Sequence, residues 1–120
     1  MEKNKVFSMP FGKVYGCLVA KAERKGHTRQ EVDALTCWLT GYTADEIREQ
    51  VENNADYGTF FEEAPAYNVH AENIKGSICG VKIQEIEDPL MKRIRQLDKL
   101  VDELARGKSV EKILAKLEDK

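Results

Sequence analysis

The chain has 120 residues, which fits a single domain spanning residues 1–120. Hydrophobic residues make up 42% and charged residues 33%, yet the formal net charge is only -2. This balance argues against a general polyanion binder, and no apolar run approaches the ~20 residues of a membrane span. Residues 1–5 lead into no apolar signal region, so we expect a cytoplasmic protein without a membrane partner.

The cysteines favour a reducing compartment. Cys17, Cys37 and Cys79 are an odd number and lie far apart, unlike a disulfide framework. Structural zinc sites usually have ligands two to four residues apart, and the only histidines here are His27 and His70. We therefore expect no metal and no cofactor.

The first forty residues predict two helices. Pro10 suits a first turn, and apolar residues recur at helical spacing until Gly26. Thr28 and Glu31 form the spacing of a capping box, and the helix that they open should end at Gly41.

Two further capping boxes follow along the chain. Thr43 and Glu46 predict a short helix through residue 51, and Thr59 and Glu62 predict one or two turns closed by Pro65. Repeated capping signals of this kind indicate a mainly helical chain.

The helical period disappears between residues 67 and 86. Val81 and Ile83 alternate with polar residues, which predicts at most one short strand or hairpin. Its partner would be Tyr67–Val69 or the same strand of a second subunit, and an irregular connector is the alternative.

The last third returns to helix. Asp88 is a suitable N-cap, Pro89 fits the first helical position, and Gly107 ends the pattern. Ser109 can cap a final helix through Leu117. The predicted fold class is therefore mainly α, a single-domain bundle of four to five helices.

An apolar stripe is the most informative feature of the long helix. Its residues are spaced 4, 3, 4, 3, and we call them the apolar seam: Leu90, Ile94, Leu97, Val101 and Leu104. Cations crowd the start of this helix and carboxylates its end, so an antiparallel twin would match opposite charges. We therefore expect a homodimer through this seam, with packing inside the chain's own core as the alternative.

A cysteine lies among cations on the first predicted helix. On helical spacing, Lys13, Cys17, Lys21 and Arg24 share one face. Neighbouring cations lower a thiol pKa and raise its reactivity, so this is a candidate thiol patch. The alternative is an ordinary solvated basic face.

The same region raises the possibility of nucleic-acid binding. Residues 1–30 carry a net charge of +5, and the remainder carries -7. Two consecutive helices resemble a helix-turn-helix, but Glu31 and Asp33 lie where phosphate contacts would be made. Nucleic acid is therefore a partner that we do not favour.

Three other groups have weaker chemical interpretations. The acidic set Glu85, Glu87 and Asp88 could hold a divalent cation, but acidic residues are favoured at a helix start, which is the simpler explanation. His70 could serve as an acid or base, but nothing in the sequence positions it. An aromatic set could line a ligand pocket or form core, and its members are Trp38, Tyr42, Phe60 and Phe61.

Ordered segments along nearly the whole chain match a family pattern. In the first half they are Lys21–Gly26, Glu31–Asp33 and Trp38–Tyr42; in the second half they are Ile78–Val81, Ile86–Met91 and Leu97–Ala105. The chain thereby resembles a small bacterial family known as domain of unknown function 2200. The resemblance implies a short, stand-alone bacterial cytoplasmic protein and brings no activity or catalytic residue.

The sequence favours a non-enzymatic interaction protein that self-associates, with no catalytic residue assigned. The first alternative is nucleic-acid binding through the basic N-terminal helices. The second is a small-molecule or thiol-based enzyme centred on Cys17 or Trp38. The sequence does not identify a small-molecule ligand.

Overall fold

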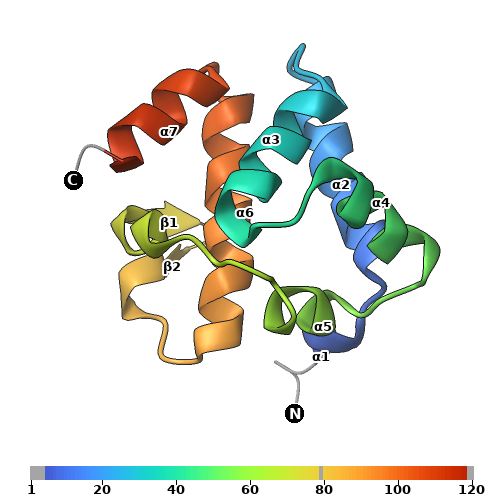
Figure 1. Cartoon of the computed structure of the whole chain (residues 1–120). Coiled ribbons are helices and arrows are strands. Elements are labelled where there is room, and N and C mark those ends of the chain that lie inside the picture. Colours follow the sequence, from blue (N-terminus) through green and yellow to red (C-terminus); the bar gives the residue numbers. More distant parts are fainter. Residues whose placement is uncertain (1–4, 79, 119–120) are drawn as a thin grey trace.

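The long helix α6, Pro89–Ala105, lies at the centre of the molecule and contacts most other elements (Figure 1). The computed structural model describes residues 5–78 and 80–118. The elements before the hairpin are α1 Lys5–Ser8, α2 Phe11–Glu23, α3 Arg29–Thr40, α4 Ala44–Glu52, α5 Tyr57–Glu62 and the 3-10 helix η2 Val69–Asn73. The remaining elements are strands β1 Ser77–Ile78 and β2 Val81–Lys82, the 3-10 helix η3 Ile83–Glu85, and α7 Val110–Glu118. The predicted mainly helical class with one short hairpin is confirmed.

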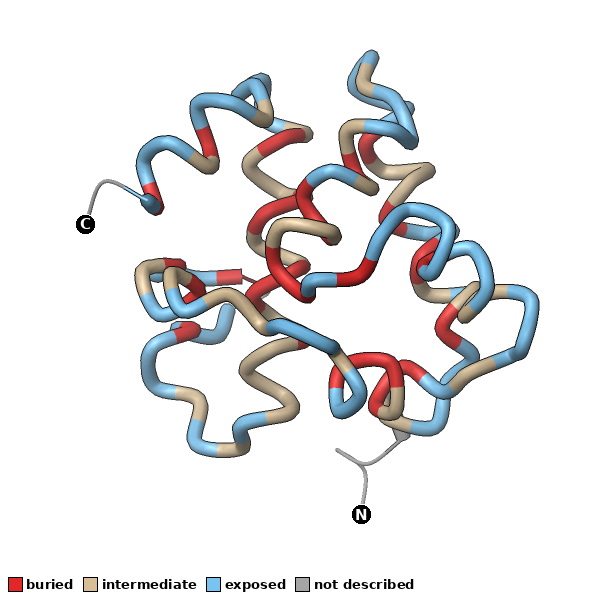
Figure 2. Tube along the Cα trace, in the orientation of Figure 1, coloured by how far each residue is buried: buried red, intermediate tan, exposed pale blue. Residues whose placement is uncertain are grey.

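The apolar seam of α6 packs inside the chain itself. Ile94, Leu97, Val101 and Leu104 are buried, and α6 contacts α2, α3, α5 and α7 (Figure 2). Leu90, in the first turn, is half-buried. The seam therefore packs in the chain's own core, which is the alternative stated above. Four of its five side chains are buried there and are not accessible to a second copy.

Helix boundaries follow the predicted caps at most positions. Thr28 and Thr43 each form a complete capping box, with Glu31 and Glu46 respectively. Asp88 accepts hydrogen bonds from the backbone N–H groups of two residues in the first turn of α6. These three caps satisfy backbone donors that a helix start otherwise leaves without partners.

The capping box predicted at Thr59 is wrong. Helix α5 begins earlier, at Tyr57, and Asp56 precedes it without a side-chain cap. Tyr57 is buried, and the backbone pairs Pro10 with Asp56, so tertiary contacts fix the start of this helix. Thr59 consequently lies within the first turn rather than ahead of it.

The hairpin pairs two adjacent segments. Ser77 lies opposite Lys82 and Ile78 opposite Val81, in antiparallel register. The predicted pairing with residues 67–69 is wrong, because Val69 begins η2. Gly80 has φ +79°, which suits the tight turn, while Cys79 lies outside the described residues.

A glycine fixes the connection that follows α3. Gly41 ends α3 at φ 85°, and a Cβ there would lie 2.7 Å from the Cβ of Ala66. The backbone N–H of Ala66 donates to the Thr40 carbonyl at 3.1 Å, and that of Asn68 donates to the Leu39 carbonyl at 2.9 Å. The segment before η2 is thus held on the end of α3.

The structure supplies one observation on membranes. Within residues 5–78 and 80–118, none of the helices combines the length and apolar character needed to span a bilayer. The described chain forms one globule with principal extents of 33 × 30 × 26 Å.

Candidate functional site

A depression made of adjoining surface hollows lies along the N-terminal half of α6. Three hollows of about 260, 450 and 240 Å³ adjoin there. The first and second share Pro89 and Arg93, and the second and third share Glu62 and Leu90. We call this depression the α6 groove and define it by six residues that line it: Phe7, Asp56, Glu62, Val69, Leu90 and Arg93.

Apolar side chains from three elements line the groove. Val69 in η2 is 80% exposed, while Phe7 in α1 and Leu90 in α6 are half-buried. Val69 holds this position because the neighbouring Asn68 donates its side-chain amide to the Trp38 carbonyl at 3.0 Å. Of these three side chains, Val69 leaves the most apolar surface open to solvent.

The end of the groove next to α5 is acidic. Asp56 and Glu62 are exposed, and within the described chain neither carboxylate has an ion-pair partner. The carboxylate of Asp88 caps α6, accepting from the backbone N–H of Leu90 at 3.0 Å and of Met91 at 3.2 Å. Two carboxylates therefore remain for a partner of opposite charge.

The other end of the groove carries charges of both signs, with Arg93 held in place and Glu72 exposed. The guanidinium of Arg93 donates to the Phe61 carbonyl at 2.7 Å, and its Cζ lies 4.1 Å from the ring centroid of Tyr67. The Tyr67 hydroxyl donates to the side-chain oxygen of buried Gln96. Burial raises the pKa of Tyr67, while Arg93 opposes that shift, so the phenol keeps its proton at neutral pH.

The predicted thiol patch has one cation already paired. Lys13, Cys17 and Arg24 are exposed along α2, but the ammonium of Lys21 lies 3.2 Å from the Asp102 carboxylate. Asp102 also lies 2.9 Å from the Arg106 guanidinium. Lys21 thus belongs to a chain of ion pairs that links α2 to α6.

The start of α3 is negatively charged, which disfavours phosphate contacts there. The Glu31 carboxylate accepts from the Thr28 backbone N–H at 2.9 Å, and this bond lowers the Glu31 pKa. Asp33 accepts from the Tyr15 hydroxyl and lies 4.0 Å from Arg29. A helix presented to nucleic acid would instead carry free cations at this end.

The aromatic set divides between core and surface. Tyr42, Phe60 and Phe61 are buried, with ring centroids of Tyr42 and Phe60 4.5 Å apart. Trp38 is half-buried, and its indole N–H donates to Glu118 of α7 at 2.7 Å. These contacts assign the three buried rings to the core. Cys37 lies next to Trp38, and burial raises the pKa of its thiol. A raised pKa disfavours the reactive thiolate form.

Of the remaining predicted groups, Glu85 and Glu87 are exposed and His70 is half-buried. Asp88 of the acidic set caps α6, and the backbone N–H of His70 donates to the Asn68 side chain at 2.8 Å. Among residues 5–78 and 80–118, no three His, Cys, Asp or Glu side chains gather as a metal site.

Sequence reasoning missed the α6 groove as a site. The periodicity places Leu90 in the seam, and the rest of the groove comes from segments far apart in the chain. One signal in the sequence is the pair of acidic residues around the predicted short helix, Asp56 and Glu62. Another was Val69, an apolar residue in a segment without helical periodicity.

Comparisons with known proteins agree with the fold. A family model described as an uncharacterized protein conserved in bacteria (DUF2200) matches residues 5–115. The crystal structure of uncharacterized protein SP1917 is similar at 47% sequence identity and a TM-score of 0.93, covering 96% of this chain and 94% of that chain. No curated protein matches the chain. The resemblance inferred from the sequence motifs is therefore confirmed.

Proposed function

From the premise that the chain belongs to the bacterial family DUF2200, we propose that it is a non-enzymatic interaction protein that self-associates through the α6 groove. The observation that carries this is the open groove, in which exposed Val69 and half-buried Leu90 adjoin carboxylates without ion-pair partners among the described residues. Protein contacts combine an apolar centre with a charged rim in this way.

The partner that the charges favour is a second copy of this chain. Met9 is a large apolar side chain with 38% exposure, and Lys13 is exposed one turn later, without an ion pair in the described chain. Met9 of one copy complements the apolar groove of the other, and Lys13 complements Glu62 and Asp56. Opposite charges of this kind orient an encounter more than they tighten it.

The two complementary parts lie next to each other on one molecule. The carbonyl of Met9 accepts from the Tyr57 backbone N–H at 2.8 Å, and Phe7, two residues earlier, lines the groove. A twofold rotation would therefore let each copy give and receive the same contact, which closes the assembly at a dimer.

The contact should be weak and sensitive to salt. Exposed ion pairs contribute about 0–1 kcal/mol each, so burial of the apolar groove residues has to supply most of the binding free energy. We expect monomer and dimer in equilibrium rather than a permanent dimer, with dissociation favoured at high ionic strength.

Charge reversal tests this proposal. Light scattering across a concentration series should give a mass rising from monomer toward dimer, and Glu62→Lys or Lys13→Glu should each suppress the rise. The double variant should restore it, because the charges are exchanged rather than lost. Glu111→Lys is the matched control, since Glu111 is exposed on α7 and away from the groove.

Two outcomes would contradict the proposal. The first is a monomeric mass for the wild-type chain at every concentration in low salt. The second is a double variant that associates no better than the single variants.

We also propose that the protein works in the cytoplasm. Cys17 and Cys37 are free thiols, and Cys17 is exposed, which suits a reducing compartment. The raised pKa of the Cys37 thiol supports a role without thiol chemistry at this residue.

A further inference from the structure

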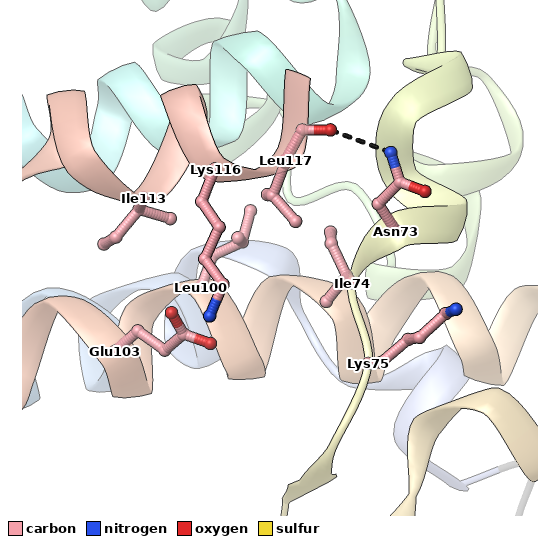
Figure 3. Close-up of a pocket in the computed structure, with 8 residues that line it drawn as sticks. All are labelled: Asn73, Ile74, Lys75, Leu100, Glu103, Ile113, Lys116 and Leu117. Carbon is pink, nitrogen blue, oxygen red and sulfur yellow. Dashed lines mark hydrogen bonds between the residues drawn. The ribbon is translucent and has the colours of Figure 1, made fainter. Parts of the chain in front are cut away.

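A separate cleft of about 220 Å³ lies between η2, α6 and α7 (Figure 3). Four aliphatic side chains form its floor: Ile74, Leu100, Ile113 and Leu117. All four are buried, and Leu100 lies in α6, Ile113 and Leu117 in α7, and Ile74 directly after η2, so the floor is the edge of the core. Asn73 ties two walls together, because its side-chain amide donates to the Leu117 carbonyl at 2.8 Å.

The rim of the cleft is cationic on balance. Lys75 and Lys116 line it, and neither has an ion-pair partner within residues 5–78 and 80–118. The one carboxylate on the rim, Glu103, is already paired with Lys108 at 3.2 Å. An anion is therefore favoured over a cation at this opening.

Lys116 is the better placed of the two free lysines. Figure 3 shows its side chain descending from α7 toward α6, with the amine drawn beside the Glu103 carboxylate and above Leu100. The amine of Lys75 points away from the floor in the same view. Lys116 can therefore hold an anionic group while an apolar body lies on the aliphatic floor.

The volume limits the size of such a ligand. An apolar cavity of about 150 Å³ holds a benzene molecule, and drug-sized ligands occupy pockets of about 300–1,000 Å³. A cleft of about 220 Å³ lies between these limits. It therefore suits a body of about six to eight carbon atoms.

We propose that this cleft binds a small aliphatic monocarboxylate, with its chain on the floor and its carboxylate on the ammonium of Lys116. This site is independent of the α6 groove, since the two share no lining residue.

Octanoate, added to methyl-labelled protein followed by NMR, tests the proposal. Saturable shifts should appear at the methyl groups of the four floor residues, and octan-1-ol should bind about tenfold more weakly because it lacks the charge. Lys116→Gln should weaken octanoate by a similar factor and leave octan-1-ol unchanged. Lys112→Gln is the matched control, since Lys112 is exposed on α7 and does not line the cleft.

Any of three results would overturn the proposal. These are an absence of saturable shifts at the floor, equal binding of acid and alcohol, and full octanoate affinity in Lys116→Gln. Performing the titration in the Glu62→Lys background keeps self-association out of the measurement, so the two proposals fail independently.

Discussion

Two buried tyrosines differ in whether their hydroxyl groups are hydrogen-bonded. The hydroxyl of Tyr15 donates to the Asp33 carboxylate at 2.5 Å and lies 3.3 Å from the Thr36 hydroxyl. The hydroxyl of Tyr57, which is 1% exposed, has no hydrogen-bond partner among the described residues. A buried polar group without a partner costs free energy, whereas a paired one contributes to stability.

Removing each hydroxyl should therefore have different effects. Tyr15→Phe should lower the free energy of unfolding by about 1–3 kcal/mol, because it leaves Asp33 without its donor. Tyr57→Phe should leave stability unchanged or raise it by about 1 kcal/mol. Urea unfolding of both variants measures the difference, and a Tyr57→Phe chain as unstable as Tyr15→Phe would contradict the assignment of an unpaired hydroxyl.

Asp98 couples the stability of the fold to pH. Burial raises the pKa of this carboxyl above its ordinary value, although Arg95, 3.2 Å away, and Lys21 act in the opposite direction. Tyr57 also faces it from α5. An acid with a higher pKa in the folded state binds its proton more tightly there, so its contribution to stability is lost as pH rises through that raised value.

Asp98→Asn should remove this pH dependence. The unfolding free energy of the variant minus that of the wild-type chain should increase as pH rises from about 4 to about 7. Urea midpoints measured across this range give the difference directly. A difference that decreases with rising pH would mean that Arg95 and Lys21 outweigh burial.

At the scale of elements, the N-caps show that some helix starts are fixed by local hydrogen bonds and others by tertiary packing. The box at Thr43 forms because its helix starts on an exposed stretch of chain, where local hydrogen bonds decide. At Thr59 the same spacing fails, since burial of Tyr57 and Phe60 fixes an earlier start for α5. Sequence spacing alone does not reveal which of these forces controls a given helix start.

Two alanine substitutions measure this contrast. Thr43→Ala should lower the free energy of unfolding by about 1 kcal/mol, because it removes an N-cap. Thr59→Ala should lower it by less than half of that, because Thr59 caps nothing. Urea unfolding of both variants decides, and equal losses would contradict the observed boundary of α5.

Most of the helices could be predicted because their signals are local. The partner of Val81 could not be predicted from apolar alternation, since a two-residue strand carries almost none. Its better signal was Gly80, whose turn brings Ile78 opposite Val81. The glycine of the turn therefore indicates the strand pairing, whereas apolar periodicity does not.

At the scale of the whole molecule, apolar periodicity predicts that a helix face is buried. It does not predict whether the same chain or a second copy buries that face. The stripe through Leu97 and Val101 fits either a twin helix or the chain's own core, and α2, α3, α5 and α7 surround α6. The α6 groove has no periodic signal, because Phe7, Glu62, Val69 and Leu90 meet only through the tertiary fold. A surface built from such distant residues can be identified only from a structure.

Self-association through the groove is the central claim, and a dilution series of amide NMR spectra tests it most directly. Between dilute and concentrated wild-type protein, shifts should change at Met9, Lys13, Glu62 and Leu90 together, and added salt should reverse them. Shifts that do not depend on concentration, or that change only at Val81 and the hairpin, would contradict it.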